Sequence, residues 1–237
     1  MFKPVIIIPT YNEKENILAI IAAVLKYNPE VDILVVDDGS PDGTAGLVEF
    51  FMSSEKRVHL LLRKQKEGLG KAYTAGFKWC LEKGFTHLVE MDADFSHRAE
   101  DLVKILKAAE ANDFVIGSRY VEGGSTVNWG ILRKIISRGG GIYSRLILGY
   151  PVQDWTGGFN LWTAPVLRKI GLDEIRSNGY SFQIELKFRA CREGFKYQEV
   201  PITFEDRRVG KSKMSLKIVL EAFYKVWLIK FSPKVGS

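Results

Sequence analysis

Short apolar runs alternate with longer helical stretches through the first half of the chain. The runs are apolar at successive positions rather than at every second one, which is typical of strands buried on both faces of a sheet. Strands are expected at residues 5–8, 33–36, 59–62, 88–91 and 114–116. Helices are expected between them, at residues 15–26, 44–52, 71–83 and 99–109. This alternation predicts an α/β fold with a mostly parallel, Rossmann-like sheet flanked by helices.

The second half of the chain has a less regular pattern. It predicts helices at residues 131–148 and 182–193, a strand at 199–204, an irregular segment at 154–162 and a last helix at 215–231. The chain contains no internal repeat and no stretch with the composition of an interdomain linker. With 237 residues, 46% of them hydrophobic, it can bury one sizeable core. We therefore expect a single domain.

Three polar clusters follow predicted strands directly: PTYNE at 9–13, DDGS at 37–40 and DAD at 92–94. Ligands of open α/β sheets bind beyond the carboxyl ends of the strands. The clusters are therefore expected to converge on one cleft.

The DAD cluster is the strongest indication of chemistry. Two carboxylates at positions i and i+2, here Asp92 and Asp94, repel each other unless a positive charge lies between them. Hard cations such as Mg²⁺ and Mn²⁺ take oxygen ligands, and a cation held there can bind a diphosphate. A chain of this length has about one D-x-D sequence by chance at ordinary Asp usage, so the position after a buried strand carries the argument.

The other two clusters can contribute to a nucleotide site. Asp37 and Asp38 either form an ordinary turn before a helix or accept hydrogen bonds from a base or ribose. Pro9, Tyr11 and Glu13 can wall a nucleotide pocket, with Tyr11 stacking on the base. Residues 68–71 (GLGK) lack the upstream glycine and the Ser or Thr of a P-loop, and no G-x-G-x-x-G follows the first strand.

Basic residues supply candidate phosphate ligands. Arg119 follows a predicted strand in the sequence GSRY and should point into the same cleft. Arg133 and Ser137 stand at i and i+4, and so on one helix face, where they can bind a phosphate. The segment 206–213 (DRRVGKSK) carries four cations; it is either a solvated face or a loop that closes over a diphosphate.

The net charge and the two cysteines limit the classes of ligand and the cellular compartments that fit this sequence. A net charge of +6 suits a phosphate, a membrane surface or a nucleic acid, but no basic stripe is interleaved with aromatic residues as nucleic-acid binding requires. Cys80 and Cys191 are isolated and suit a reducing compartment. The first residues lack the features of a signal peptide, so we expect the active face on the cytoplasmic side of a membrane.

The last predicted helix, 215–231, has a broad apolar face interrupted by charges and is too short and too charged to span a bilayer. It fits peripheral docking on a membrane surface, packing against a small membrane subunit, or packing on its own sheet.

Taken in order, eight motifs resemble those of the dolichol-phosphate (polyprenol-phosphate) mannose synthases, which are inverting nucleotide-sugar glycosyltransferases with a GT-A fold. They are PTYNE, DDGSPDGT, DAD followed by FSH, GSRY, RKIIS, DWTGGF, YSFQIE and DRRVGKSKMS. The resemblance covers nearly the whole chain, and GSRY and DRRVGKSKMS are its more specific parts. It implies one GT-A domain over residues 1–237. Residues 1–120 would bind the nucleotide sugar, 121–214 the acceptor and a closing loop, and 215–237 would form the amphipathic helix.

The resemblance implies metal-dependent transfer of mannose from GDP-mannose to a dolichyl or polyprenyl monophosphate, with inversion and with Mg²⁺ or Mn²⁺ as cofactor. The spacing of residues by itself also allows a UDP-sugar donor such as UDP-glucose, or a nucleotide-sugar-binding module without turnover.

Carried over position by position, the resemblance also implies roles for single residues. The implied donor-binding residues are Pro9, Tyr11, Glu13, Val36, Asp37, Asp38, Asp92, Ala93, Asp94, Ser96, Arg207 and Lys213. Asp92, Asp94 and Ser96 would hold the metal, and Arg119, Arg133 and Ser137 the acceptor phosphate. Asp94, Arg207 and Lys213 would be catalytic, the last two by neutralising the departing diphosphate. Ser96, Asn160 and Gly141 depart from residues frequent in relatives, which are Gln, Arg and Asn.

Overall fold

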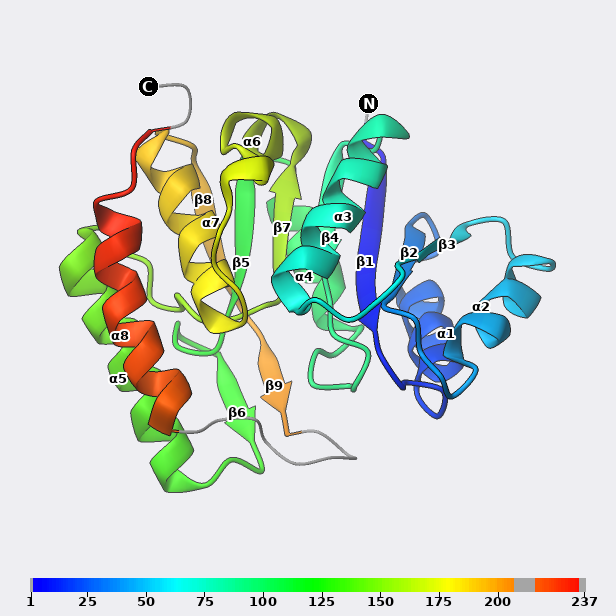
Figure 1. Cartoon of the computed structure of the whole chain (residues 1–237), viewed down its shortest axis with the longest axis horizontal. Helices are drawn as coiled ribbons and strands as arrows, with labels where there is room; N and C mark the ends of the chain where they lie inside the picture. The colour runs from blue at the N-terminus through cyan, green and yellow to red at the C-terminus, as the bar shows by residue number, and fades with distance from the viewer. Residues whose placement is uncertain (1, 207–215, 235–237) are drawn as a thin grey trace.

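The computed structural model describes residues 2–206 and 216–234. Its strands are β1 Pro4–Thr10, β2 Asp32–Asp37, β3 Val58–Leu62, β4 His87–Glu90, β5 Phe114–Ser118, β6 Ser125–Val127, β7 Asn160–Thr163, β8 Tyr197–Pro201 and β9 Thr203–Glu205. Its helices are α1 Ile17–Tyr27, α2 Thr44–Met52, α3 Leu69–Glu82, α4 Asp101–Ala108, α5 Ile131–Leu148, α6 Ala164–Lys169, the 3₁₀ turn Leu172–Glu174, α7 Tyr180–Arg192 and α8 Leu216–Lys230. Figure 1 shows these elements along the chain.

The main sheet has the strand order β3-β2-β1-β4-β7-β5-β8 within the described residues. All neighbours are parallel except β7, which runs antiparallel to both β4 and β5. The predicted mostly parallel sheet is therefore confirmed. The prediction of an irregular segment at 154–162 is wrong at its end, because β7 begins at Asn160 and takes a central place. This strand has too few apolar residues to show the apolar run that predicts a strand. Its place in the sheet is set by the pairing of Leu161 with Val89 and Val115.

The core lies on both faces of this sheet. In β1, the side chains of Ile6 and Ile8 pack with α1, α2 and α4, whereas those of Val5 and Ile7 pack with α3, α6 and α7. All four are completely buried, because helices cover both faces of a sheet of this type. The continuous apolar runs of the sequence are thus explained, and the carboxyl edge of the sheet is left for polar residues.

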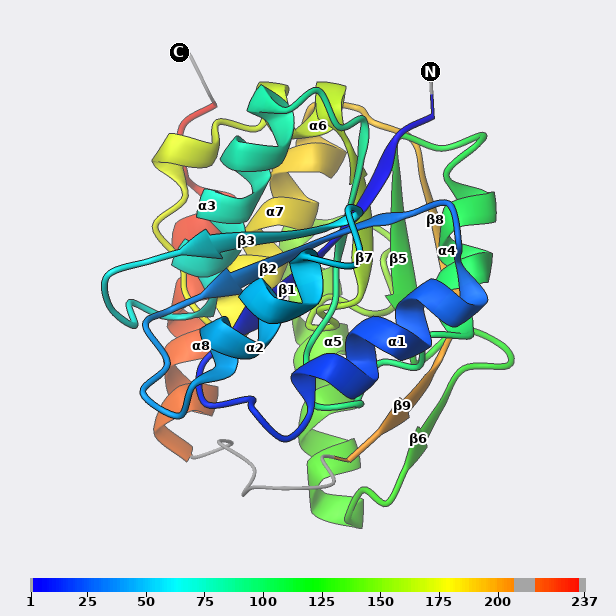
Figure 2. The same ribbon diagram turned by 90° about the vertical axis from the view of Figure 1, so that its right-hand side faces the viewer.

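A second, two-stranded sheet lies apart from the main one. It pairs β6 with β9 in parallel, and Figures 1 and 2 both show it beyond the carboxyl end of β5. The strand expected at 199–204 is therefore two strands: β8 joins the main sheet and β9 leaves it. The chain changes course at Ile202, whose N–H donates to the Ser118 carbonyl while its own carbonyl accepts from the Ser125 N–H.

The last helix, α8, packs against α5 and α7. In its described part Val226 and Ile229 are buried in the core. This side of the helix therefore packs on the rest of the protein, but through α5 and α7 rather than directly on the sheet. Within the described ranges, no helix is both long enough and apolar enough to cross a bilayer.

Candidate functional site

The three polar clusters lie at one edge of the sheet, as expected. Strand β1 is the parallel neighbour of both β2 and β4, so the loops after these strands leave from the same side. The loops after β1 and β2 are joined directly. The N–H of Asn12 donates to Ser40 Oγ at 2.9 Å, and that of Glu13 to Thr44 Oγ1 at 3.1 Å. These contacts hold the two loops together as one wall of the site.

Asp37 has a structural part in this wall. It is completely buried, and its carboxylate accepts hydrogen bonds from Thr10 Oγ1 at 2.8 Å, Ser40 N at 2.8 Å and Ser40 Oγ at 2.6 Å. Gly39 completes the turn with a φ of +73°, a conformation that glycine adopts without strain. Val36 is also completely buried, within the core. Both residues shape the turn that presents Asp38, and their expected contacts with the donor stay predictions.

Asp38 lies beside a cation that the sequence reasoning did not name. Arg63 Nη1 donates to Asp38 Oδ1 at 2.6 Å, and the other terminal nitrogen donates to Glu67. Burial raises the pKa of Asp38, and the charge of Arg63 opposes that change. The Lys66 ammonium lies 4.0 Å from the centre of the Tyr11 ring. The loop between β3 and α3 thus adds two cations to the expected nucleotide wall.

Asp92 and Asp94 stand on the loop after β4, each partly exposed. This loop is folded back on itself: Ser96 N donates to Asp94 Oδ1 at 3.1 Å, and Asp92 N donates to His97 Nδ1 at 3.0 Å. Phe95 takes a φ of +62°, a left-handed conformation uncommon for an aromatic residue. The two carboxylates are therefore held in a tight, partly strained turn.

His97 links this turn to the other half of the molecule. The ring is buried, stacks on Phe159 with centroids 4.7 Å apart, and lies edge-on to Phe204. Burial lowers the pKa of His97 to about 4; the charge of Asp94 opposes the change, and that of Arg119 adds to it. The imidazole is thus neutral at pH 7, as an acceptor at Nδ1 requires.

The residues of the DAD turn fit a particular kind of cation site. Among the described residues, no group of three or more His, Cys, Asp or Glu side chains is close enough to hold a metal ion. Mg²⁺ is commonly held by one or two carboxylates and completes its ligand set with substrate phosphates and water. The Ser96 hydroxyl is buried and has no hydrogen-bond partner among the described residues, so its oxygen is not already used. The arrangement therefore fits a cation shared with a diphosphate.

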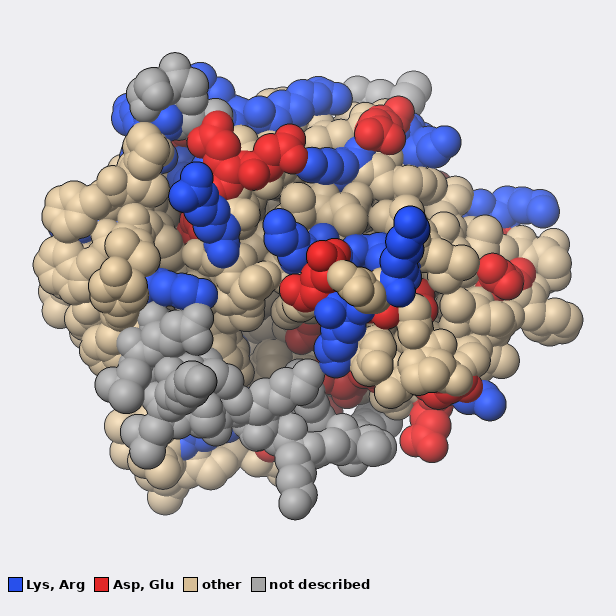
Figure 3. Space-filling model, viewed as in Figure 1, with Lys and Arg blue, Asp and Glu red and all other residues tan. Residues whose placement is uncertain are grey.

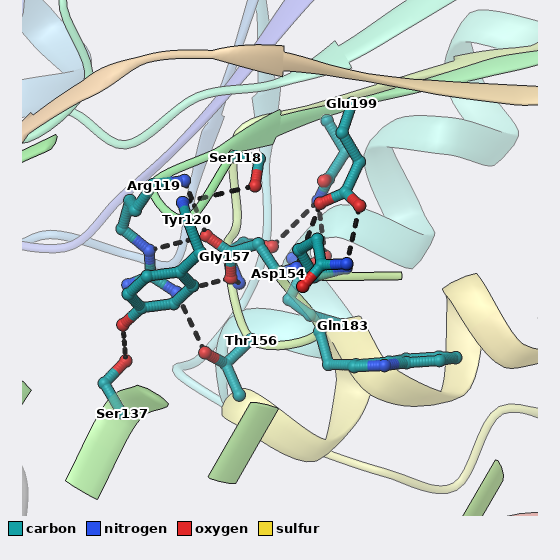
Figure 4. Close-up of polar contacts among 12 residues, drawn as sticks. Ser118, Arg119, Tyr120, Ser137, Asp154, Thr156, Gly157, Gln183 and Glu199 are labelled. Carbon is teal, nitrogen blue, oxygen red and sulfur yellow. Dashed lines mark hydrogen bonds and ion pairs between the residues drawn. The ribbon is translucent and has the colours of Figure 1, made fainter. Parts of the chain in front are cut away.

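On the other side of His97, Arg119 and Asp154 form a buried ion pair (Figure 4). Asp154 accepts from Arg119 Nε and Nη2, both at 2.7 Å, and from the Arg119 backbone N–H at 3.0 Å. Burial alone would raise the pKa of Asp154, but the charge and hydrogen bonds of Arg119 lower it to about 2. Nη2 also donates to Thr156. Arg119 directly follows the last residue of β5. Most of its donor groups point to Asp154 in the interior, so its role as a phosphate ligand stays a prediction.

Arg133 and Ser137 lie on one face of α5, as the i, i+4 spacing predicts. Arg133 Nη1 donates to Asp206 Oδ1 at 2.6 Å, and its guanidinium stacks 4.0 Å from the centre of the Trp129 ring. Ser137 accepts from the Tyr120 hydroxyl at 2.6 Å (Figure 4). Because Tyr120 follows Arg119, the three expected phosphate ligands belong to one region. The predicted residues Arg207 and Lys213 lie outside the described part of the chain.

A buried polar network lies beneath the site, and it has little signature in the sequence. Glu90, at the end of β4, is completely buried and accepts from Asn160 Nδ2, Trp162 Nε1 and Gln183 Nε2 at 2.9–3.0 Å. Asn160, the departure from the Arg frequent in relatives, is thus an interior residue here. The only signal in the sequence is that a carboxylate interrupts the apolar run before the DAD turn.

The same network fixes the loop that carries Asp154. Lys187 is completely buried on α7 and donates to the carbonyl oxygens of Asp154 at 2.9 Å and Gly157 at 2.8 Å. Glu199 accepts from the backbone N–H groups of Gln153 and Asp154. Buried polar groups are usually hydrogen-bonded. Polar side chains on a helix that has no exposed face, as on α7, therefore indicate such a network.

Substitution of Glu90 by Gln is expected to change how stability depends on pH. Burial raises the pKa of Glu90 to about 7 from an ordinary 4.5, so in this interval the folded state binds a proton that the unfolded state has released. The contribution of Glu90 is most favourable below pH 4.5 and declines as pH rises to 7. Urea unfolding at steps across pH 4.5–7 measures the free energy of unfolding of the wild type and of Glu90→Gln. The difference between the two proteins is expected to vary with pH. The exposed Glu122→Gln is the control, and a constant difference for Glu90→Gln would contradict the assignment.

Comparison with known proteins places this geometry in a family. The family described as glycosyl transferase family 2 matches residues 5–171. The chain is 49% identical over 226 residues to a polyprenol monophosphomannose synthase of Mycolicibacterium smegmatis, covering 94% of this chain and 85% of that protein. It is 49% identical over 220 residues to an undecaprenyl-phosphate mannosyltransferase of Micrococcus luteus, covering 93% and 90%.

Solved structures confirm the fold. A glucosyl-3-phosphoglycerate synthase from Mycobacterium tuberculosis, in complex with Mn²⁺, UDP and phosphoglyceric acid, superposes with a TM-score of 0.71 at 15% identity, over 99% of this chain and 81% of that one. A mannosyltransferase from Pyrobaculum calidifontis, in complex with GDP-Man and Mn²⁺, gives a TM-score of 0.57 at 15% identity, over 96% and 73%. The resemblance carried by the motifs is therefore confirmed. The chain belongs to glycosyl transferase family 2 and has the GT-A fold.

Proposed function

We propose that the protein transfers mannose from GDP-mannose to a polyprenyl monophosphate, of the dolichyl or a related type, and inverts the anomeric carbon. The names and extent of the two relatives support this proposal. The structural observation that supports it is the position of two groups of residues at one end of the sheet. Asp92 and Asp94 lie on the loop after β4, and the proposed phosphate ligands Arg133 and Ser137 lie on α5. His97 lies between them, bonded to Asp92 and packed against Phe204.

The donor half would bind the nucleotide sugar through Pro9, Tyr11, Glu13 and Asp38. A divalent cation, Mg²⁺ or Mn²⁺, held by Asp92 and Asp94, would neutralise the charge that develops on the leaving GDP. Arg63 and Lys66 add positive charge to the nucleotide wall. A GDP-mannose complex of a protein with the same fold is consistent with this donor.

The acceptor half needs no general base from the protein. A phosphate monoester has a second pKa near 6, so at neutral pH much of the acceptor is a dianion and is already nucleophilic. Asp154 is ionised, but Arg119 occupies both of its carboxylate oxygens. Asp154 therefore positions Arg119 rather than removing a proton. A single displacement by the phosphate oxygen gives a β-linked product from an α-linked donor.

Transfer assays with the full chain test this function. The donors GDP-mannose, UDP-glucose and UDP-N-acetylglucosamine are each offered with a polyprenyl phosphate or the corresponding polyprenol, with Mg²⁺, with Mn²⁺ or with EDTA. Transfer is expected only from GDP-mannose to the phosphate and only with a metal ion, and NMR of the product should show a β-mannoside. Transfer from a UDP-sugar would replace the donor assignment, an α-linked product would refute inversion, and GDP-mannose binding without transfer would indicate a binding module.

Arg133→Gln is expected to raise the KM for polyprenyl phosphate about tenfold or more with a smaller change in kcat. A hydrogen bond to a charged group contributes about 1.5–3 kcal/mol, and 1.4 kcal/mol corresponds to a factor of ten. The matched control is Lys134→Gln, which removes the same charge from the next residue, an exposed one. Equal effects of the two variants would show that α5 acts only through its overall charge.

A polyprenyl phosphate is a membrane lipid, so the reaction would take place at a membrane surface. We propose peripheral association with the cytoplasmic face, with or without a small membrane subunit. The reducing setting inferred from Cys80 and Cys191, both buried free thiols, supports the cytoplasmic assignment.

A further inference from the structure

The tryptophan that precedes α5 has a buried indole N–H without a hydrogen-bond partner. Trp129 is 8% exposed, and its Nε1 makes no hydrogen bond to any residue that the structure describes. An indole N–H can only donate, and burial of a donor without a partner costs free energy. Such a group indicates that a hydrogen-bond acceptor binds beside it.

The backbone around Trp129 turns the ring into the protein. Asn128 takes a φ of +61°, in the left-handed region that Asn adopts more readily than most residues. Gly130 then leads into α5 in an extended conformation. On the other side, Val127 ends β6, and its carbonyl accepts from the Asp206 N–H at 3.2 Å. The indole is thus held where the small sheet and the start of α5 meet.

Both arginines of the proposed acceptor site lie against this ring. The guanidinium carbon of Arg133 is 4.0 Å from the centre of the Trp129 ring, and that of Arg119 is 5.4 Å from it. Ser137, the third residue of that site, accepts from Tyr120, whose ring centre is 5.3 Å from the Arg119 guanidinium carbon. The unpaired N–H therefore lies among cations, where an anion is a more favourable partner than a neutral group.

A second tryptophan separates this position from ordinary core packing. The Nε1 of Trp155 is also buried and unpaired among the described residues, but its side chain belongs to an apolar core cluster. Trp129 lies outside both core clusters and has two guanidinium groups against its ring. Apolar packing accounts for the position of Trp155, whereas that of Trp129 fits a ligand.

A row of rings connects Trp129 to the DAD turn. The Trp129 and Phe204 rings lie edge-on with centroids 5.4 Å apart, and Phe204 lies edge-on to His97 at 5.3 Å. His97 in turn accepts from the Asp92 N–H. Strand β9, which carries Phe204, lies beyond the carboxyl end of β5 (Figure 1), and Figure 3 shows this face hollowed near the place of β9, with charged side chains along one side of the hollow. A ligand can therefore reach this end of the sheet from solvent.

We propose that the Trp129 indole N–H donates a hydrogen bond to an oxygen of the acceptor phosphate, beside Arg133 and Ser137. The guanidinium groups supply charge, and the indole supplies direction: it holds one phosphate oxygen and leaves another free to face the anomeric carbon. The lipid part of this ligand rests on the proposed function, whereas recognition of a phosphate monoester does not.

Trp129→Phe removes the N–H and keeps an aromatic ring for the two guanidinium groups. It is expected to raise the KM for polyprenyl phosphate about tenfold, the size of one hydrogen bond to a charged group, with a smaller change in kcat. The KM for GDP-mannose should not change. The matched control is Trp79→Phe, the same replacement in the last turn of α3, where the ring lies beside His59. A KM for polyprenyl phosphate equal to that of the wild type would overturn the proposal.

Nuclear magnetic resonance of the wild type tests the hydrogen bond without a reaction. The indole N–H signal of Trp129 is identified by its absence from the spectrum of Trp129→Phe. Farnesyl phosphate is expected to move this proton signal downfield by more than any other indole signal, and farnesol to leave it in place. The same shift with inorganic phosphate would show that the phosphate group alone is sufficient, and a shift with farnesyl phosphate only would show that the prenyl chain is also required.

Two results would contradict the assignment of Trp129. One is an unmoved signal at saturating farnesyl phosphate, and the other is a shift caused by GDP with Mg²⁺ but not by farnesyl phosphate, which would assign the N–H to the donor. If farnesyl phosphate gives the expected shift and the protein transfers no mannose, the proposed function fails while this assignment stands. If transfer is normal and the signal does not move, the assignment fails by itself.

Discussion

Replacing Asp94 by Asn is expected to lower mannose transfer about 10³-fold while the protein remains folded. Asp94 is partly exposed on the loop after β4, and its Oδ1 accepts from the Ser96 backbone N–H. Asn keeps the shape of the side chain and an oxygen for this hydrogen bond, but it removes the negative charge that a divalent cation requires. Losing the stabilisation of charge on a leaving group typically costs a factor of 10² to 10³ in rate.

Single-turnover transfer and Mn²⁺ binding by calorimetry measure this effect together. The control is Asp173→Asn, a conservative change at an exposed carboxylate that pairs with Lys78, away from the loop after β4. Both variants should unfold at temperatures close to that of the wild type. Near-normal turnover in Asp94→Asn, or normal Mn²⁺ affinity accompanying lost turnover, would rule out the role assigned to this carboxylate.

Replacing Asp154 by Asn is expected to reduce the free energy of unfolding by about 3 to 5 kcal/mol, the usual result of removing one partner of a buried ion pair. Arg119 would then keep a buried charge without its counter-ion, since both of the carboxylate oxygens that hold it belong to Asp154. The wild-type contribution of Asp154 should also weaken in acid. Its folded pKa of about 2 is below the ordinary 3.8, so this stability is present above pH 3.8 and is lost as pH falls toward 2.

A double-mutant cycle with Arg119→Met separates this pair from general disruption of the loop. Because the double variant has no unpaired charge, it should be destabilised by clearly less than the sum of the two single changes. Urea unfolding of the four proteins at pH 7 supplies the comparison. Additive losses would mean that Asp154 and Arg119 do not act as a pair in solution.

The local pattern was sufficient for the strands that lead to the site. Buried strands such as β1 and β4 produce continuous apolar runs, and the polar residues that follow them must lie at the sheet edge. The order of the motifs resembles that of the family, and PTYNE, DAD and GSRY among them each stand where one of these strands ends. The α5 pair Arg133 and Ser137 followed from helical spacing alone.

Other parts of the site could not be predicted in this way. Asp37 and Asp38 are adjacent acids, yet one is completely buried under Thr10 and Ser40, and the other pairs with Arg63. Periodicity does not distinguish them, because the partners Thr10, at the end of β1, and Arg63, after β3, are 27 and 25 positions away in the chain.

The sequence by itself determined the type of fold, the edge of the sheet that holds polar chemistry, and the family. Only the tertiary structure decided that β7 enters the centre of the sheet, that Arg119 is held by Asp154, and that Glu90 is buried beside Gln183. Local preferences act over a few neighbouring residues, whereas these features depend on groups far apart in the chain. Arg119 and Asp154 are 35 positions apart, and Glu90 and Gln183 are 93 apart. A buried charge has a stable place only where folding brings such a partner to it.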